Sequence, residues 1–357
     1  MADSPGWMLY GANGFTGRLI TAESVGRGMK PILAGRSADK IERLGQDADC
    51  PCRVFSLTSV DEVVKHLDGV SAVLHCAGPF SQTARPMMEA CIARGVHYLD
   101  ITGEIDVIEW ASQQSDRART AGVTLLPAVG MDVVPSDCLA ALLSESLPNA
   151  VRLELAFSGE LSVSPGTAKT IWQDIHRGGQ VRQDGQIVRV PAGWKTLEVP
   201  FSRKSRLAMT IPWGDVASAY HTTGIPNIEV YAALSRKQIT QTRRFRWLVA
   251  MAGLTPVQWM GRRWIDRRVS GPDERELLHG RTEFWGRVTD GDGRTAEATL
   301  ETPNGYTLTV QTSLAVLKQV LEGHVAPGFF TPARAFGGDF IRQLSDVTFQ
   351  WIDRPGS

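Results

Sequence analysis

Residues 8–17, Met-Leu-Tyr-Gly-Ala-Asn-Gly-Phe-Thr-Gly, decide the fold, because a short apolar run leads into three evenly spaced glycines and then into a helical pattern. In such a unit Gly11 permits the tight turn, Gly14 lets the backbone approach phosphates, and Gly17 allows close packing of the helix. The first amide groups of the helix then face the anion. Although the spacing is GxxGxxG rather than GxGxxG, it predicts a dinucleotide site. The residues expected in it are Gly11, Asn13, Gly14, Phe15, Thr16 and Gly17.

The next predicted strand, residues 30–36, brings Arg36 to the position that contacts the adenosine ribose. Sites that prefer NAD normally carry an acidic residue here, whereas this chain has Arg36, Ser37 and Lys40. A guanidinium binds a 2′-phosphate through charge-assisted hydrogen bonds and stacks on adenine. We therefore expect NADP as the cofactor. The alternative is that Arg36 is an ordinary solvated residue after a strand.

Beyond Arg36, apolar runs alternate with helical patterns, which is typical of a doubly wound parallel sheet. The predicted strands are 53–57, 72–77, 98–101 and 124–128, and the predicted helices are 19–27, 60–67, 83–94 and 107–121. Right-handed crossovers place the carboxyl ends of all strands at one edge. We expect further cofactor contacts from two turns at this edge. They are formed by Cys76, Ala77, Gly78, Pro79 and Phe80, and by Thr102, Gly103 and Glu104. The first has an alternative interpretation as a simple strand-exit turn.

The composition sets limits on the class of protein. A chain of 357 residues with 43% hydrophobic and 21% charged residues is long enough for two domains and typical of a soluble protein. Lys plus Arg equals Asp plus Glu at 38 each, so we expect no nucleic-acid partner. The five cysteines lack metal-ligand spacing, which favours a reduced cytoplasmic protein without a metal. We also expect no signal peptide and no membrane span.

Five segments together resemble the saccharopine dehydrogenase-like oxidoreductases, and most closely the branch of trans-acting enoyl reductases and lipid-associated proteins. These segments are Tyr10–Gly17, Leu33–Arg36, Cys76–Phe80, Tyr98–Glu104 and Gly130–Asp137, with further matches at Gly166–Thr167 and Phe329–Gly337. The resemblance implies an N-terminal NADP-binding Rossmann domain and an inserted α/β domain with a mixed sheet. It also implies a last helix that returns to the first domain. It does not imply activity on saccharopine.

The predicted fold is therefore α/β with two domains. A Rossmann-type doubly wound parallel sheet occupies residues 1–130, and residues 331–357 return to it. Residues 131–330 form an α+β domain for substrate binding and dimerisation, built on a mixed, largely antiparallel sheet. Its predicted strands are 151–157, 207–211, 227–234, 281–289, 296–301 and 306–312, with helices at 167–176 and 313–321. One face of this sheet remains for a ligand or a partner subunit, and we expect a homodimer.

These features favour an NADPH-dependent reductase acting on a C=C (enoyl) bond of an apolar or lipid-like substrate. No tyrosine has the lysine four residues later that short-chain dehydrogenases use. Asp132 is the catalytic candidate, with bracing of its own turn as the alternative role. The substrate-binding candidates are Gly130, Met131, Ser136, Asp137, Gly166 and Thr167, although Ser136 or Asp137 could instead cap a helix. Two alternative functions are an imine or carbonyl reductase of the saccharopine reductase type and a non-catalytic protein that binds NADP or lipid.

Residues 243–268 differ from the rest of the chain. They carry seven arginines around apolar stretches that contain Trp247, Trp259 and Trp264. This pattern is typical of a helix that lies at a lipid surface, so we expect peripheral membrane contact or contact with a lipid-like substrate. The alternative is a helical hairpin packed within the subunit or against a dimer partner.

Overall fold

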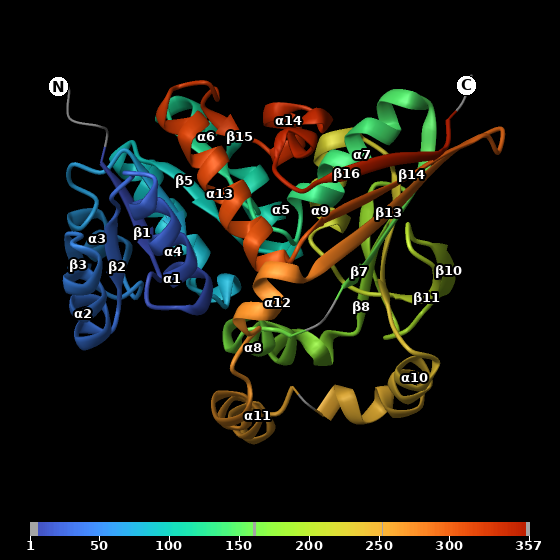
Figure 1. Ribbon diagram of the computed structural model, residues 1–357, viewed down its shortest axis with the longest axis horizontal. Coiled ribbons are helices and arrows are strands. Elements are labelled where there is room, and N and C mark those ends of the chain that lie inside the picture. Colours follow the sequence, from blue (N-terminus) through green and yellow to red (C-terminus); the bar gives the residue numbers. More distant parts are fainter. Residues whose placement is uncertain (1–5, 160–161, 252, 355–357) are drawn as a thin grey trace. The chain divides into compact units, whose positions relative to one another are not determined.

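The computed structural model describes residues 6–159, 162–251 and 253–354. The chain divides into two compact units (Figure 1). Unit 1 consists of Met1–Met131 and Leu308–Ala335, and unit 2 of Asp132–Thr307 and Phe336–Ser357. Each unit contains one β-sheet with its own helices, and we describe the units separately.

Unit 1 is built on a parallel seven-stranded sheet in the order β3-β2-β1-β4-β5-β6-β15, which confirms the predicted doubly wound fold. Its strands are β1 (Trp7–Tyr10), β2 (Ile32–Gly35), β3 (Cys52–Val54), β4 (Ala72–His75), β5 (His97–Asp100), β6 (Thr124–Leu126) and β15 (Gly328–Phe329). All residues of β1 and β4 are buried, as expected where helices cover both faces. The chain changes direction between these two strands, and ligands of such sheets bind at this point.

The helices of unit 1 fall into two packed groups. Helices α1 and α2 contact each other, as do α3, α4 and α5 in succession. The bounds are α1 (Phe15–Gly26), α2 (Ala38–Ala48), α3 (Val60–Lys65), α4 (Phe80–Arg94), α5 (Ile105–Gln113), α6 (Ser115–Thr120), α13 (Gly305–Leu321) and α14 (Pro332–Phe336). The predicted helix at 107–121 is therefore two helices, α5 and α6. Of α13 and α14, the residues from Leu308 to Ala335 belong to unit 1.

The prediction of a strand at 306–312 is wrong, because this segment is the first part of helix α13. Its alternating β-branched residues imitate a strand pattern, but tertiary packing overrides this weak propensity. Leu308, Leu314 and Leu317 are buried. Their spacing is helical, and the pattern runs on into residues 313–321, the segment correctly predicted as a helix. Asn304 caps the start, since its side-chain oxygen accepts a hydrogen bond from the Tyr306 amide at 2.9 Å.

The predicted return of residues 331–357 to the first domain also needs correction. The returning segment is Leu308–Ala335, and it adds β15 alongside β6. Residues from Phe336 onward belong to unit 2. There β16 (Thr348–Asp353) pairs antiparallel with β14 and forms the edge of the second sheet. Its alternating side chains suit an edge strand with one covered face, a signal that the sequence interpretation missed.

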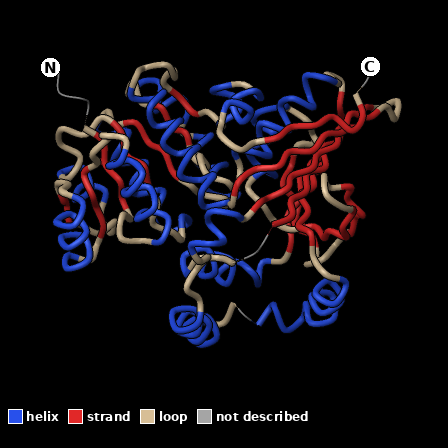
Figure 2. The backbone as a smooth tube through the Cα atoms, viewed as in Figure 1, coloured by secondary structure: helices blue, strands red, loops and turns tan. Residues whose placement is uncertain are grey.

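Unit 2 contains the predicted mixed, largely antiparallel sheet, and Figure 2 draws its strands in red. The strand order is β10-β11-β12-β7-β13-β14-β16, with β8 and β9 added beside β12. Within it β7 and β12 run parallel. The strands are β7 (Ala150–Gly159), β8 (Gly179–Gln183), β9 (Gln186–Val190), β10 (Thr196–Pro200), β11 (Ser205–Thr210), β12 (Asn227–Ala233), β13 (Arg281–Asp290), β14 (Thr295–Pro303) and β16. The helical segments are α7 (Val134–Ser146), α8 (Pro165–Asp174), η1 (Ile175–Arg177), α9 (Asp215–Thr223), α10 (Arg236–Met251), α11 (Thr255–Arg268), α12 (Glu274–His279) and η2 (Gly338–Gln343).

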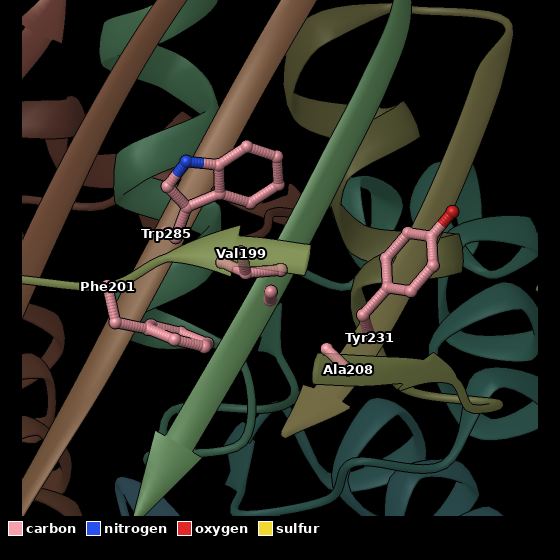
Figure 3. Packing of buried hydrophobic residues seen from close by; sticks show 6 residues of the cluster. Val199, Phe201, Ala208, Tyr231 and Trp285 are labelled. Carbon is pink, nitrogen blue, oxygen red and sulfur yellow. The ribbon is translucent and has the colours of Figure 1, made fainter. Parts of the chain in front are cut away.

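Two layers of apolar side chains hold this sheet. Helix α7 packs on β13 and β14, and Gly286 of β13 allows this close approach, because an added Cβ would lie 2.6 Å from Leu143 Cδ1. Another cluster gathers around Trp285, whose side chain is 1% exposed (Figure 3). Its remaining members are Ala156, Val199, Phe201, Ala208 and Tyr231. The Trp285 indole N–H donates to Glu297 Oε1 at 2.5 Å, so the buried ring also has its polar atom satisfied.

Replacing Trp285 by alanine tests the importance of this cluster. We expect Trp285→Ala to lower the free energy of unfolding by about 3–5 kcal/mol, because it leaves a large cavity. Ile352→Ala on β16, where the side chain is 49% exposed, is the control and should change stability by less than about 0.5 kcal/mol. Guanidinium denaturation measures both values. Similar losses in the two variants would contradict the assignment of Trp285 to the core.

Candidate functional site

The three glycines after β1 have different physical roles. Gly11 has a φ of +83°, and a Cβ there would lie 2.8 Å from the Ala77 backbone nitrogen. A Cβ at Gly17 would lie 2.4 Å from the Gly11 carbonyl oxygen, so α1 packs directly on the turn. At Gly14 the nearest atom would be the Gly11 oxygen at 3.1 Å. The fold itself therefore requires Gly11 and Gly17. At Gly14 the contact with the Gly11 oxygen would be close, but no other described atom would lie within 4 Å, so the space beside the helix start is otherwise open.

This space lies at the N-terminus of α1, where a helix leaves amide groups for an outside acceptor. Gly14 is the N-cap residue and provides no side-chain cap, and the first turn contains no acidic residue. The remaining predicted members of the turn, Asn13, Phe15 and Thr16, are half-buried. The positive end of the helix dipole therefore faces this space, and no carboxylate in the first turn of the helix competes with an anion for it.

Positive side chains follow the next strand. Arg36 and Lys40 are exposed, and within the described chain neither forms an ion pair with a carboxylate. Arg36 lies close enough to Tyr10 to oppose the rise in the tyrosine pKa, which burial still raises to about 12. The Tyr10 hydroxyl donates to the Phe55 carbonyl at 3.0 Å. Half-buried Ser37 precedes α2 as its N-cap without a side-chain cap bond.

The turn after β4 is held by its own polar contacts. The Thr83 hydroxyl donates to the Ala77 carbonyl at 2.6 Å and lies 3.0 Å from His75 Nε2. His75 is buried, and burial lowers its pKa to about 3, so it stays neutral. Because the Thr83 hydroxyl donates its one proton to the Ala77 carbonyl, it accepts from His75, which therefore carries its proton on Nε2. Burial raises the pKa of the Cys76 thiol, which therefore stays protonated and is a poor nucleophile.

Glu104 has a clear structural role. Its two carboxylate oxygens accept hydrogen bonds from the amides of Phe80 and Ser81, each at 2.7 Å. Phe80 is the first residue of α4, so the carboxylate caps this helix and interacts favourably with its dipole. The contact joins two turns that the sequence predicted separately, Cys76–Phe80 and Thr102–Glu104. Glu104 thus positions the predicted cofactor turn, and direct contact with a cofactor stays a prediction.

Asp100, which the sequence interpretation did not single out, lies at the centre of this edge of the sheet. The buried carboxylate accepts hydrogen bonds from the Tyr98 hydroxyl at 2.7 Å and from the amides of Thr102 at 3.0 Å and Ala128 at 2.8 Å. Burial raises its pKa to about 6, although these donors oppose the shift. Ala128 has a φ of +62°, which L-residues rarely adopt. The sequence did carry a signal for this role, because Asp100 is a charged residue at the end of an otherwise apolar strand.

The turn after β6 is fixed by helix α13. The Met131 amide donates to Thr309 Oγ1 at 3.0 Å, and the Thr312 hydroxyl donates to the Val129 carbonyl at 2.7 Å. A Cβ at Gly130 would lie 3.2 Å from Thr309 Cγ2, so the contact is close. Two of the predicted substrate residues therefore lie in a braced turn. Thr309 was missed because its segment was interpreted as a strand.

Asp132 begins unit 2. Its side chain is half-buried, and burial raises the pKa of the carboxyl from 3.8 to about 7. The Asp132 carbonyl accepts a hydrogen bond from the Trp213 indole N–H at 2.6 Å, which fixes the backbone at this point. Bracing of the turn therefore comes from the main chain. The side chain has a pKa in the range where a general acid works best.

Ser136 and Asp137 are buried where α7 packs on α9. The predicted role of capping does not apply, since α7 begins at Val134 and both residues lie inside its first turns. Asp137 Oδ1 accepts a hydrogen bond from the Thr222 hydroxyl at 2.6 Å. Neighbouring Asp215 is fully buried. Burial, together with the nearby charges of Asp137 and Asp132, raises the pKa of Asp215 well above its usual range.

The remaining substrate candidates lie at the start of α8. The Thr167 amide donates to Ser164 Oγ at 3.2 Å, and the Ser164 amide donates to the Tyr306 hydroxyl at 2.6 Å. The hydroxyls of Thr167 and Tyr306 are 3.3 Å apart. Gly166 is exposed, and an added Cβ there would lie 3.6 Å from Ser164 Oγ, an ordinary van der Waals distance. The structure thus places Thr167 in a hydroxyl cluster with Tyr306, a residue that the sequence interpretation did not include. Among the described residues, no group of His, Cys, Asp and Glu side chains is arranged to hold a metal ion.

The raised pKa of Asp132 predicts a pH-dependent stability. The folded chain binds the Asp132 proton more tightly than the unfolded chain, so this stabilisation is complete below about pH 4 and is lost as the pH rises through 7. We expect the stability of the wild type to fall by about 1–3 kcal/mol relative to Asp132→Asn between about pH 4 and pH 8. Urea denaturation across this range measures it, with Asp47→Asn on α2 as the control. A difference that stays constant with pH would contradict the shift.

The N-terminal part of the chain is similar to a known family of domains. Residues 7–126 match the model of the saccharopine dehydrogenase NADP binding domain. The human saccharopine dehydrogenase-like oxidoreductase is 28% identical over 153 residues, which cover 36% of this chain and 35% of the human protein. A trans-acting enoyl reductase of Mycobacterium leprae is 32% identical over 142 residues, 36% of this chain and 33% of that protein. The chain thus covers about a third of the length of these curated relatives.

The fold extends the likeness to the whole chain. Saccharopine dehydrogenase (L-Glu forming) from Saccharomyces cerevisiae aligns with a TM-score of 0.64, covering 98% of this chain and all of the yeast protein. Its sequence identity is 11%, so this likeness concerns the fold alone. The domain match and the shared fold agree with the glycine turn and the parallel sheet of unit 1. Residues 7–126 therefore match the NADP-binding domain of saccharopine dehydrogenases, and the whole chain shares its fold with the yeast protein.

Proposed function

We propose that this protein is an NADPH-dependent oxidoreductase that reduces a C=C bond of an apolar, enoyl-type substrate. The observation that carries the proposal is the turn at Gly14 together with the exposed Arg36 that follows β2, for which the described residues provide no carboxylate partner. The turn offers helix amides to a pyrophosphate, and the guanidinium offers a bidentate partner to a 2′-phosphate. Both features lie in unit 1 and follow neighbouring strands of its sheet. The described residues therefore fit NADPH better than NADH.

Bound NADPH supplies a hydride to the acceptor, and the protein must then orient the acceptor and provide a proton. Asp132 is our candidate donor. With a pKa of about 7 its carboxyl is protonated in about half of the molecules near neutral pH, which suits a general acid. Two other groups in the predicted region are less suitable. His75 is neutral with a pKa of about 3, and desolvation raises the pKa of the Cys76 thiol well above neutral pH.

Two arguments favour an enoyl substrate. The matched mycobacterial protein is named an enoyl reductase, although the match covers 36% of this chain. The chain also lacks the Tyr and Lys pair with which short-chain dehydrogenases protonate a carbonyl oxygen. The shared fold with a saccharopine dehydrogenase keeps an imine or carbonyl reductase as the second candidate. A protein that binds NADP without turnover is the third.

Turnover assays separate these three functions. Purified protein with NADPH is given panels of enoyl thioesters, imines and aldehydes, and consumption of reduced nicotinamide is followed. Oxidation with enoyl compounds alone supports the proposal, and oxidation with imines or aldehydes alone favours the second candidate. Stoichiometric NADPH binding without oxidation on any panel would indicate a binding protein.

Arg36 should determine the choice of cofactor. We expect Arg36→Ala to weaken NADPH binding by about 1.5–3 kcal/mol, because a charge-assisted hydrogen bond to the 2′-phosphate is lost, and to leave NADH binding nearly unchanged. Isothermal titration calorimetry measures both affinities. Arg43→Ala, an exposed position on α2, is the matched control. Equal losses for the two cofactors would remove Arg36 from the 2′-phosphate site.

Gly14 should leave room for the pyrophosphate. Gly14→Val places a branched side chain in the space beside the start of α1, so NADPH binding should be lost while the fold survives. Gly26→Val is the control, because a Cβ at the end of the same helix would meet no atom within 4 Å. Circular dichroism checks the fold and calorimetry the affinity. Wild-type affinity in Gly14→Val would show that the phosphates bind elsewhere.

A further inference from the structure

We infer that the outer face of helix α11 docks on an anionic lipid surface. The outer face consists of Trp259, Met260, Arg263, Trp264 and Arg267, all exposed. These positions repeat at intervals of three and four residues, so they form one stripe along the helix. The side chains of Trp259, Met260 and Trp264 are 59%, 62% and 63% exposed. Three adjacent large apolar side chains with such exposure mark an interaction surface.

The opposite side of α11 fixes the direction of the outer face. A Cβ at Gly261 would lie 2.1 Å from the Trp172 indole nitrogen, so α11 packs directly on α8. Arg262 Nη2 donates to Gln173 Oε1 at 3.0 Å, and Ile265 is 4% exposed. Because these contacts hold the inner side, the tryptophans are presented outward on a preformed helix.

The positive charge of residues 236–268 indicates that the outer face binds an anionic lipid surface. Residues 236–268 contain nine Lys and Arg residues and one acidic residue, Asp266, which pairs with Lys169. The Arg263 guanidinium lies 5.1 Å from the centre of the Trp259 ring, so positive charge lies beside the apolar surface. A two-fold contact between copies would bring this face against the same positive face. Anionic head groups, in contrast, neutralise the arginines while the tryptophans enter the interface.

The dimensions suit a helix that lies along the surface. The 14 residues of α11 extend for about 21 Å, less than the roughly 30 Å of a hydrocarbon core. None of the described helices is long and apolar enough to cross a membrane. On α10, Phe245 is 42% exposed with the Arg244 guanidinium 5.6 Å from its ring, which repeats the pairing of an aromatic ring with an arginine. The Trp247 side chain, which the sequence pattern also indicated, lies outside the described residues.

Vesicle flotation tests the inference with the full chain and vesicles of phosphatidylcholine, with or without phosphatidylglycerol, at about 50 mM and 500 mM salt. The wild type should bind the anionic vesicles, more strongly at low salt. We expect Trp259→Ala/Trp264→Ala to weaken binding at least tenfold at both salt concentrations, since apolar burial is not screened. Arg263→Glu/Arg267→Glu should weaken it by a similar factor at low salt and much less at high salt, because each arginine contributes about fivefold.

Matched variants control for charge and apolar area. Arg43→Glu/Arg334→Glu changes two other exposed arginines, and Ile352→Ala removes another exposed apolar side chain. Both should bind vesicles like the wild type. All variants should retain NADPH affinity, so failure of this inference is distinguishable from failure of the proposed function. Absence of wild-type binding to anionic vesicles, equal effects of face and control variants, or a self-association that the face variants abolish would each overturn the inference.

Discussion

The close contact between helix α1 and the turn that precedes it is the constraint on which the candidate site depends. At Gly17 the helix backbone comes so near the Gly11 carbonyl that no Cβ fits, and Gly11 itself lies against Ala77 of the neighbouring turn. The amide groups of the helix start are thereby placed at the point where the strand order of the sheet reverses. Gly14 alone of the three leaves room for a ligand, so fold and binding have separate requirements within one motif.

Buried carboxylates then fix the surrounding loops of unit 1. Asp100 links the turns after β5 and β6, and Glu104 caps α4 and thereby holds the turn after β4. A hydrogen bond from an amide to a carboxylate is stronger than a neutral one, and these bonds are shielded from water. The resulting rigid edge suits a proposed cofactor site, because a preorganised site loses little entropy on binding. Asp132, the proposed proton donor, belongs to unit 2, where burial raises the pKa of its carboxyl to about 7.

The sequence predicted the parallel sheet, the glycine turn and most strands of the second sheet, because these depend on local periodicity and on glycines at fixed spacing. It could not predict interactions that depend on distant residues. Tyr306–Thr312 resembles a strand locally and becomes helical through packing, and the capping role of Glu104 involves residues 24 positions earlier. The predicted cofactor residues lie in or beside the expected turns. Of the substrate candidates, Ser136 and Asp137 are buried within α7, and Gly166 and Thr167 lie in the first turn of α8. Whether they bind ligands depends on chemistry that periodicity does not encode.

The central claim is that unit 1 recognises a nicotinamide dinucleotide through its pyrophosphate and its 2′-phosphate. Calorimetric titration of the wild-type protein with NADPH and with NADH, which differ in that phosphate alone, tests it most directly. A charge-assisted contact of roughly 1.5–3 kcal/mol corresponds to a preference for NADPH of about tenfold or more. The preference should shrink as salt screens the exposed arginine. Equal affinities for the two cofactors, or binding of neither, would contradict the account.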